Sequence, residues 1–333
     1  MMEITRCPSL LSNGFTSYSP SALKNLFDGK KVSHILNFSS PSSSNSDGKQ
    51  ALENSGRLSL SGAQSKFGFI LDENDNLRYS VENEQSSYIL KPRPTGYHVI
   101  NAEFCAANEN LTMQLASQIY GIETATNGLC WFKDNQEAYI TKRFDVHPGG
   151  KYALEDFASL LGLTKANGGS DFKYCNASYE ECGEIIRRYV KSAMVDLLRF
   201  FRVVLFNFIT LNDDAHLKNF SLISDGKEYR LSPAYDLLNT SLQIYEPRIF
   251  ALEKGLFKEG MYLSDTRQVS SKDFSELGRR LGLPEKLILQ EIIRFSSPND
   301  KADALINRSY LSETLKGYYL SSYHYRQSMI RPK

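Results

Sequence analysis

The chain of 333 residues is 41% hydrophobic and 23% charged, which is ordinary globular usage, and its length suits two domains or one large two-lobed unit. A formal net charge of +1 excludes a global electrostatic attraction to nucleic acid or anionic membranes. Five cysteines, an odd number without a CxxC pair, argue against a disulfide framework or a zinc site and indicate a reducing cytosol.

The N-terminal residues and the most apolar stretch both indicate where in the cell the protein resides. The start, MMEITRCPSL, contains no apolar segment of signal-peptide type. The most apolar stretch, residues 194–211, carries Asp196, Arg199 and Arg202, so it is better interpreted as a buried helix than as a membrane span. We therefore expect a soluble, cytoplasmic protein that does not enter a membrane.

A serine-rich segment separates a short N-terminal piece from the body of the chain. Residues 39–50 (SSPSSSNSDGKQ) hold six serines in their first eight positions and cannot bury enough apolar area to order themselves. The piece before it contains SPSALKNLF (19–27), which predicts a capped helix. We divide the chain into an N-terminal extension with its linker (1–50), a first lobe (51–145) and a second lobe (146–333).

The first lobe is rich in predicted strands with one predicted helix among them. The helix is expected over 101–121, where apolar residues recur at helical spacing and Gly121 follows. The acidic, Asn-rich DENDN sequence predicts a hairpin turn inside 66–80. The predicted strands lie in LSLSG (58–62), KFGFILDENDNLRYS (66–80), SSYILKPRP (86–94), LCWF (129–132) and EAYITKRF (137–144).

The second lobe is predicted to be mostly helical. From residue 152 onward, helical patterns are expected in LEDFASLLG (154–162) and, after a Gly/Asn-rich loop, in the long stretch 181–211. A β-rich lobe followed by a helical lobe predicts an α+β protein with two lobes.

The sequence NDDAHLKN (212–219) holds the first candidate for chemistry. Asp214 and Asn219 are five residues apart, which is the spacing of the aspartate and asparagine in the kinase catalytic loop H-R-D-L-x-x-x-N. There the aspartate accepts a proton from the substrate hydroxyl and the asparagine holds Mg²⁺. Asp213 is one position out of this register, so we predict Asp214 as the base. Alone, the D-x4-N pattern is common by chance.

A second aspartate follows at the expected distance. FSLI, SDGK and EYRL predict a strand, a turn and a strand that lead into SPAYDLL, so that Asp236 lies seventeen residues after Asn219. Kinases use such a hairpin to connect the catalytic loop to a second metal-binding aspartate. We expect Asp236 to bridge Mg²⁺ to the phosphates of ATP.

Candidate phosphate-binding residues lie upstream. Lys91 ends the predicted strand YILK, as a lysine does in the V-A-I-K strand of kinases. Glu109, on the following helix, either pairs with Lys91 or faces solvent. SLSGAQSK (59–66) is a glycine-containing segment whose backbone N–H groups could approach phosphate, although it is not G-x-G-x-x-G.

These motifs together resemble a known family. SLSGAQSK, YILKPRP, ANENLTMQLA, ITKRFD, NDDAHLKNF and LSPAYDLL occur in the order found in the HipA-type serine/threonine kinases, the toxins of bacterial toxin–antitoxin modules. The resemblance covers roughly residues 55–300. The resemblance implies a protein-kinase-like fold with an N-lobe and a C-lobe. Because the chain is shorter than full-length HipA, we expect it to lack the N-terminal subdomain of HipA. In this it is similar to HipT, the short kinase of three-component HipBST systems, where a separate small protein supplies that subdomain.

The resemblance implies a set of ATP-binding residues. Lys142 stands where the family usually has glutamate, which matters little if backbone atoms bind the adenine. Asp214 is implied as the base, and Asn219 and Asp236 as the metal ligands. The implied ATP contacts are Ser61, Gly62, Ala63, Gln64, Ser65, Lys66, Lys91, Lys142, Arg143, Phe144, His216, Leu217, Lys218, Asn219, Tyr235 and Asp236.

The resemblance also implies a biological role. It implies a kinase that uses ATP and Mg²⁺ to phosphorylate an aminoacyl-tRNA synthetase, glutamyl as for HipA or tryptophanyl as for HipT, and so stalls translation. Its partners would be a HipB-like DNA-binding antitoxin and a HipS-like small subunit, with DNA contacted only through the antitoxin. Autophosphorylation at Ser59 or Ser61 would inhibit it, because a phosphoserine adds a charge of about −1.5 to −2 where ATP phosphates belong.

Two other functions compete with this one. A regulatory pseudokinase would bind a partner and transfer nothing, but it has no need of an intact set of Lys91, Asp214, Asn219 and Asp236. A metal-dependent phosphoesterase would use Asp214 and His216 as ligands, but none of the other four histidines lies in a metal-ligand motif.

Overall fold

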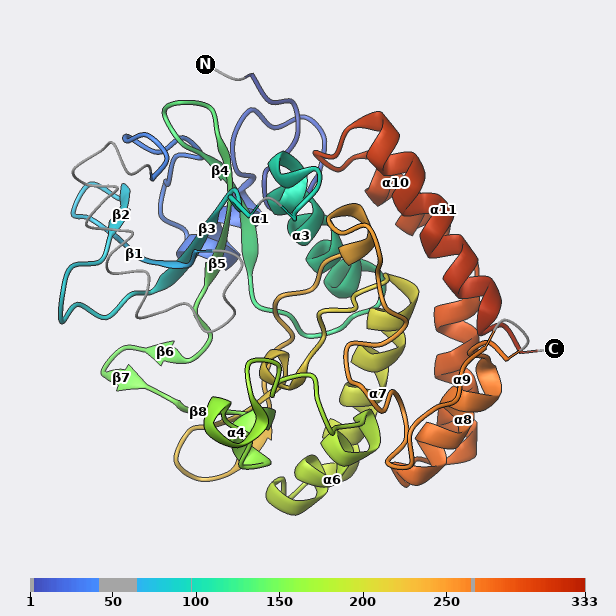
Figure 1. Cartoon of the computed structure of the whole chain (residues 1–333). Helices are drawn as coiled ribbons and strands as arrows, with labels where there is room; N and C mark the ends of the chain where they lie inside the picture. The colour runs from blue at the N-terminus through green and yellow to red at the C-terminus, as the bar shows by residue number, and fades with distance from the viewer. Residues whose placement is uncertain (1–2, 42–64, 97, 265–266, 333) are drawn as a thin grey trace.

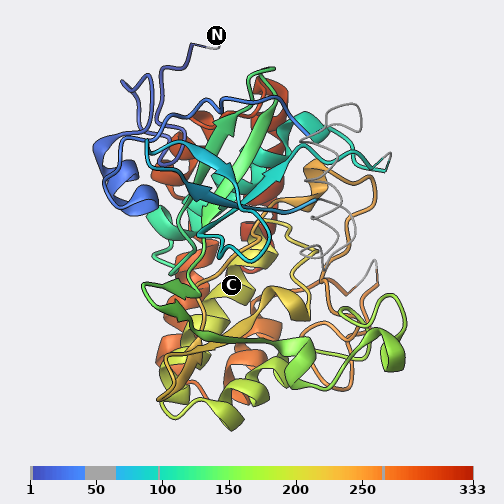
Figure 2. The ribbon, with the colours of Figure 1, turned by 90° about the vertical axis from the view of Figure 1, so that its left-hand side faces the viewer.

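The structure is a computed structural model, and it describes residues 3–41, 65–96, 98–264 and 267–332. A β-rich lobe formed by the first part of the chain sits against a mostly helical lobe formed by the second part (Figure 1). Figure 2, turned by 90°, shows the large sheet above and the helices below. The predicted α+β, two-lobed fold class is confirmed.

The β-rich lobe is built on a five-stranded antiparallel sheet in the order β2-β1-β3-β5-β4. The predicted hairpin around DENDN is present, because the Asp72 carboxylate accepts the N–H groups of Asn74 and Asn76 at 2.8 Å each and closes the turn. One face of the sheet buries aromatic side chains such as Phe67 and Phe69. The strands are β1 (Phe67–Leu71), β2 (Leu77–Tyr79), β3 (Tyr88–Pro92), β4 (Asn127–Trp131) and β5 (Glu137–Lys142).

Residues 3–41 pack on this sheet and cover the outer edge of β4. The predicted capped helix is α1 (Pro20–Phe27), whose Ser19 side chain accepts the N–H of Ala22. Along β4, Leu129 donates its N–H to the Pro8 carbonyl at 2.9 Å, and Trp131 donates to the His34 carbonyl at 2.8 Å. An edge strand with unpaired backbone groups would invite aggregation, and the N-terminal segment satisfies these groups here.

The helix predicted over 101–121 is confirmed as three successive helical segments, η1 (Ala102–Phe104), α3 (Cys105–Gln114) and η2 (Leu115–Ile119). Gly121 follows with φ of +56°, a conformation that glycine adopts without steric cost. Every residue of α3 is buried, including its polar ones. The helix lies between the sheet and the C-terminal helices (Figure 1).

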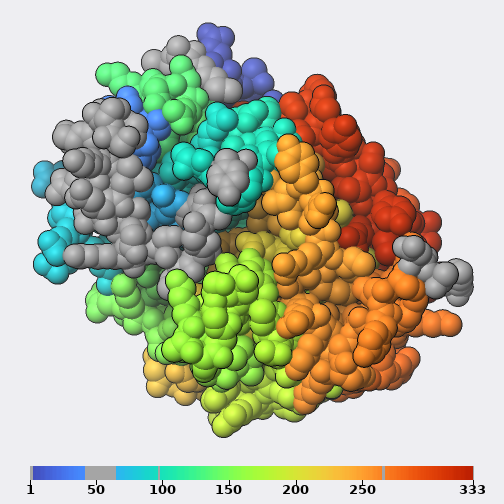
Figure 3. Space-filling view, viewed as in Figure 1, coloured from blue at the N-terminus to red at the C-terminus, as the bar shows by residue number. Residues whose placement is uncertain are grey.

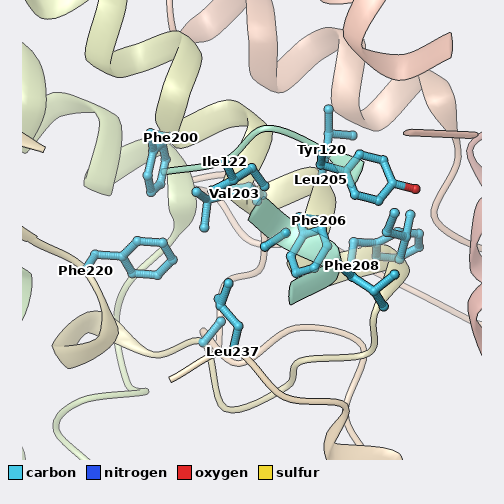
Figure 4. Close-up of a cluster of buried hydrophobic side chains, with 14 of the residues drawn as sticks. Tyr120, Ile122, Phe200, Val203, Leu205, Phe206, Phe208, Phe220 and Leu237 are labelled. Carbon is cyan, nitrogen blue, oxygen red and sulfur yellow. The ribbon is translucent and has the colours of Figure 1, made fainter. Parts of the chain in front are cut away.

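The helical lobe is organised around α7 (Ala193–Ile209). The stretch predicted as continuous over 181–211 is divided into α6 (Tyr179–Tyr189) and α7, with a break between them. Eleven of the seventeen α7 residues are buried, and Figure 4 shows its aromatic side chains meeting Tyr120 and Ile122, which follow α3. No described helix, α7 included, is long and apolar enough to cross a membrane.

The other helices of this lobe lie around α7, and its strands form two small sheets. In Figures 1 and 3, α10 and α11 (red) run along one side of the molecule. The remaining helical elements are α4 (Phe157–Leu160), α5 (Lys165–Gly168), η3 (Leu217–Asn219), η4 (Thr240–Leu242), α8 (Ser271–Arg280), α9 (Glu285–Ser296), α10 (Asp300–Asn307) and α11 (Glu313–Met329). The strands are β6 (Val146–His147), β7 (Gly150–Lys151), β8 (Ala153–Asp156), β9 (Ser221–Ser224) and β10 (Tyr229–Leu231).

In this lobe the structure also corrects the prediction for residues 154–162 and bears out the predicted hairpin. The start of LEDFASLLG, predicted as helix, is strand β8, because Leu154 pairs with Ile223 of β9 and the ladder satisfies its backbone groups. Asp156 then caps the short α4 by accepting the N–H of Ser159 at 2.9 Å. The predicted hairpin after Asn219 is present as β9 and β10.

Candidate active site between the lobes

A cavity of about 350 Å³ lies between the two lobes. The β-rich lobe contributes residues of β3 and β5, and the helical lobe contributes the loop before β9 and the segment after β10. The cavity therefore brings together motifs that are up to 170 residues apart in the chain, as Lys66 and Asp236 are. Its lining residues are Lys66, Ile89, Lys91, Ala125, Thr141, Lys142, Arg143, Phe144, Asp145, Leu154, Asp156, His216, Lys218, Asn219, Ser221, Tyr235 and Asp236.

Lys91, which is buried, forms two ion pairs in this cavity. Strand β3 holds it between the lobes, and its Nζ lies 2.6 Å from Oε1 of Glu109 and 2.5 Å from Oδ1 of Asp236. Burial alone would lower the pKa of Lys91, but the carboxylates of Asp236 and Glu109 outweigh it and raise that pKa. Glu109 is therefore a partner of Lys91, and the alternative in which it faces solvent is wrong.

Asp236 binds two cationic side chains of the site. Its backbone has φ of +55°, an uncommon conformation for a residue with a side chain, and Lys66 Nζ lies 2.9 Å from its Oδ2. Burial would raise the pKa of Asp236, but the ammonium groups of Lys66 and Lys91 hold it well below its usual range. Both carboxylate oxygens thus bind a cationic group.

The loop from Asp213 to Asn219 is held tightly by its own hydrogen bonds. The Asp214 carbonyl accepts the N–H of His216 at 2.7 Å and the side-chain Nδ2 of Asn219 at 3.1 Å. Because Nδ2 is used in this way, the Oδ1 atom of Asn219 is the amide atom left for a ligand in the cavity. The loop continues into η3, and the apolar flanks are α7 and β9, as expected from the sequence.

The two adjacent aspartates have different environments. The Asp214 side chain is 42% exposed, and its Oδ1 accepts a hydrogen bond from the Tyr174 hydroxyl at 2.5 Å. Asp213 is buried, its Oδ2 accepts the Arg248 N–H at 2.5 Å, and its own N–H donates to Oγ1 of Thr240. Asp214 is accessible to solvent, whereas Asp213 fixes the surrounding backbone.

His216 lines the cavity, and its ring is held by packing. Its side chain is buried against Tyr174, with ring centroids 5.0 Å apart and the rings nearly perpendicular. Neither ring nitrogen has a hydrogen-bond partner within the part of the chain that the structure describes. Burial lowers the pKa of His216 to about 4, so the ring is neutral at pH 7.

The residues expected near the adenine and beside the metal also lie around the cavity. Arg143 donates hydrogen bonds to both carboxylate oxygens of Asp145, from Nε at 2.9 Å and from Nη2 at 2.5 Å. The ring centroids of Phe144 and Tyr235 lie 5.7 Å apart. The Tyr235 hydroxyl donates to the Lys218 carbonyl at 2.9 Å. The structure thus assembles these side chains around one space, which both aromatic rings and lysines line.

Some expected contacts lie elsewhere. Leu217 is fully buried in the hydrophobic core and does not line the cavity. Ser65 is described but is not a lining residue. Ser59, Ser61, Gly62, Ala63 and Gln64 lie outside the described residues, so the structure says nothing about the glycine-containing segment or the two candidate phosphorylation sites.

Several lining residues were missed by the sequence analysis. Ile89 had a usable signal, because it lies two residues before Lys91 on β3 and so shares its face of the sheet. Asp156 had no usable sequence signal, because its segment was predicted as helix. In the structure its Oδ2 lies 3.2 Å from Nζ of Lys218. Tyr174, which contacts Asp214 but does not line the cavity, lies in a loop without periodicity and also gave no signal.

The site offers oxygen ligands, which a magnesium ion prefers. It offers them from two side chains, and proteins often supply this few when a nucleotide provides the remaining ligands. The Asp236 carboxylate and the free Oδ1 of Asn219 are oxygen ligands, and the ammonium group on Oδ2 of Asp236 shows that a cation is stabilised there. Among the described residues, no group of three or more His, Cys, Asp or Glu side chains is arranged to hold a metal. A metal here would depend on ligands from a bound phosphate as well.

Comparison with known proteins shows the family. Residues 58–299 match the family model described as the HipA-like C-terminal domain. The chain belongs to this family. Among curated proteins, it is 25% identical over 291 residues to a Haemophilus influenzae protein named "Putative kinase", with 82% of each chain covered. It is 31% identical over 200 residues to the similarly named Y4mE of Sinorhizobium fredii, covering 55% of this chain and 43% of that protein.

Solved structures show that this HipA-like chain has the fold of its family. It superposes on HipA of Shewanella oneidensis, solved with HipB and operator DNA, with a TM-score of 0.61, 20% identity and coverage of 82% of this chain and 65% of that one. It also superposes on the Helicobacter pylori proinflammatory kinase CtkA with a TM-score of 0.51, 19% identity and coverage of 79% and 90%. Both matches support the two-lobed, kinase-like fold.

Proposed function

We propose that this HipA-like chain is a protein kinase that transfers the γ-phosphoryl group of ATP to a serine or threonine hydroxyl, with Mg²⁺ as the metal. The observation that carries the proposal is Lys91, which joins Glu109 of α3 to Asp236 across the lobes at 2.6 and 2.5 Å. In protein kinases a strand lysine paired with a helix glutamate, together with a metal-binding aspartate, defines the assembled active state.

The cavity accounts for both ends of a nucleotide. Ile89, Ala125 and Phe144 make part of its lining apolar, which suits the adenine ring. Lys66 and Lys91, also in the lining, supply positive charge for the phosphates. The backbone N–H of Phe144 donates no backbone hydrogen bond within the described chain, so this donor is free to bind the adenine edge.

Side chains of the protein supply the metal ligands, the proton acceptor and the positive charge that phosphoryl transfer needs. Asp236 and Asn219 would hold Mg²⁺, which neutralises charge on the phosphates when bound. Asp214 is exposed enough to accept the proton of the acceptor hydroxyl while that oxygen bonds to the γ-phosphorus and ADP leaves. Lys91 and Lys66 stabilise the charge that develops on the phosphoryl oxygens.

Membership of the HipA-like family is the basis for the proposed protein substrate, partners and regulation. As a HipA-type toxin in the cytoplasm, the kinase would phosphorylate an aminoacyl-tRNA synthetase, tryptophanyl or glutamyl, and so stall translation. A HipB-like antitoxin and a HipS-like small subunit would restrain it; the Shewanella HipA was solved with HipB and its operator DNA, which supports a partner of this kind. Autophosphorylation at Ser59 or Ser61 would inhibit it.

The deciding experiment incubates the protein with Mg²⁺ and ATP labelled in its γ-phosphate. The proposal predicts label on the protein itself, and loss of that label in Asp214→Asn. Release of free phosphate without any phosphoprotein would instead favour the metal-dependent phosphoesterase, and no reaction at all would favour the pseudokinase. Repeating the reaction with purified tryptophanyl- and glutamyl-tRNA synthetases identifies which of them, if either, becomes labelled.

A further inference from the structure

Tyr174, in the loop between α5 and α6, contacts the catalytic aspartate directly. Its hydroxyl donates to Oδ1 of Asp214 at 2.5 Å, so one of the two carboxylate oxygens is already bound by the chain itself. The Asp214 side chain remains 42% exposed, although Asp214 is not among the residues that line the cavity. A tyrosine at this place is not part of any motif that the sequence analysis identified.

The backbone around Tyr174 is fixed from both sides. The Lys173 carbonyl accepts the N–H of Leu217 at 3.1 Å, which ties the loop to the catalytic loop. The Tyr174 carbonyl accepts the N–H of Glu253 at 3.0 Å, and its own N–H donates to the Asp171 carbonyl at 2.8 Å. A residue whose backbone groups are all bonded in this way cannot swing aside at little cost.

The ring of Tyr174 is fixed as well. It packs edge-on against the buried His216, and the guanidinium of Arg248 lies 5.7 Å from its centroid. Arg248 is itself anchored, because its backbone N–H donates to Oδ2 of Asp213. The buried aspartate therefore supports, through Arg248, the tyrosine that contacts the exposed aspartate.

We propose that Tyr174 is a positioning residue for phosphoryl transfer, whose hydroxyl holds Oδ1 of Asp214 so that Oδ2 faces the acceptor hydroxyl. The proposal rests on the proposed kinase function. During transfer the acceptor proton moves to Oδ2, the acceptor oxygen bonds to the γ-phosphorus, and the bond to ADP breaks. A donor fixed before the reaction removes the need to orient the carboxylate during it.

Tyr174 remains a proton donor throughout this step. Burial and the neighbouring Asp214 raise the pKa of its phenol, so the hydroxyl keeps its proton at neutral pH. The competing possibility is that Tyr174 occupies the place of the acceptor hydroxyl and blocks it. That arrangement needs a residue that can move away, whereas the loop of Tyr174 is bonded to two other segments.

The test compares Tyr174→Phe with the wild-type protein in self-phosphorylation, measured as a function of ATP concentration with Mg²⁺ present. Phenylalanine keeps the ring packed against His216 and removes only the hydroxyl. We expect the maximal rate to fall about tenfold to a hundredfold, because the carboxylate loses the donor that orients it, while the ATP concentration at half-maximal rate stays unchanged. Tyr189→Phe, the same change at an exposed tyrosine of α6, should leave the rate unaltered.

Each other result overturns the proposal. An unchanged maximal rate would show that the hydroxyl is not used, and a higher rate would show that Tyr174 blocks the acceptor. A higher half-maximal ATP concentration at unchanged rate would place its effect on nucleotide binding. If the wild-type protein transfers no phosphate, the proposed kinase function is wrong. That result is obtained before any variant is compared.

Discussion

Asn108 of α3 and Asn239 of the segment after Asp236 bind each other through two hydrogen bonds. The Asn108 side chain donates from Nδ2 to the Asn239 carbonyl at 2.8 Å, and its Oδ1 accepts the Asn239 N–H at 3.0 Å. Both residues are fully buried. Asn108 precedes Glu109 and Asn239 lies three residues after Asp236, so this pair joins the two elements that supply the carboxylate partners of Lys91. Helix α3 is therefore fixed to the helical lobe in the arrangement that the site requires.

Removing the Asn108 amide should destabilise the protein. Asn108→Ala leaves the N–H and carbonyl of Asn239 buried without their partner, which costs about 1–3 kcal/mol of unfolding free energy. Urea unfolding followed by fluorescence measures this loss. Asn74→Ala, at an exposed asparagine of the β1–β2 turn, is the matched control and should change little. Equal stability of the two variants would show that the pair contributes nothing to the attachment of α3.

The buried charges on Lys91 lead to a second prediction. Lys91→Met leaves Glu109 buried without its cation, and breaking a buried ion pair from one side costs about 3–5 kcal/mol. Adding Glu109→Gln removes the stranded charge, so the double variant should regain part of the lost stability while phosphoryl transfer stays abolished. Lys227→Met, at the exposed β9–β10 turn, controls for loss of a lysine. If the double variant is less stable than the single one, the charge on Glu109 is not the cause.

The sequence predicted those parts of the site whose spacing along the chain is set by local structure. Asp214 and Asn219 lie in one short loop, and the hairpin of β9 and β10 fixes the distance to Asp236, so both could be recognised. Tyr174 and Asn108 could not, because their roles depend on contacts 40 and 131 residues away that leave no periodic pattern. Strand β8 was missed for the same reason, since its pairing with β9 overrides a local preference for helix.

His216 should make stability depend on pH. Its pKa is lowered by burial to about 4 in the folded protein, against about 6.5 for an unperturbed histidine. Between these values the unfolded chain binds more protons at this residue, so the unfolding free energy falls as pH drops from 6.5 to 4, by up to ~3 kcal/mol. In His216→Gln, urea midpoints measured across this range should fall less steeply than in the wild type. His147→Gln, at the β6–β7 turn, should retain the wild-type slope.

The adjacent aspartates should fail in different ways when each is replaced by alanine. Asp214→Ala removes the exposed proton acceptor and should lower phosphoryl transfer by about 10²- to 10⁴-fold with little effect on unfolding, since that side chain is 42% exposed. Asp213→Ala should retain most of the transfer rate but lose about 1–3 kcal/mol of unfolding free energy, because the Arg248 N–H loses its acceptor. Self-phosphorylation and urea unfolding, measured on both variants, separate the two effects. Equal losses of transfer rate would show that the assignment of Asp214 as the base is wrong.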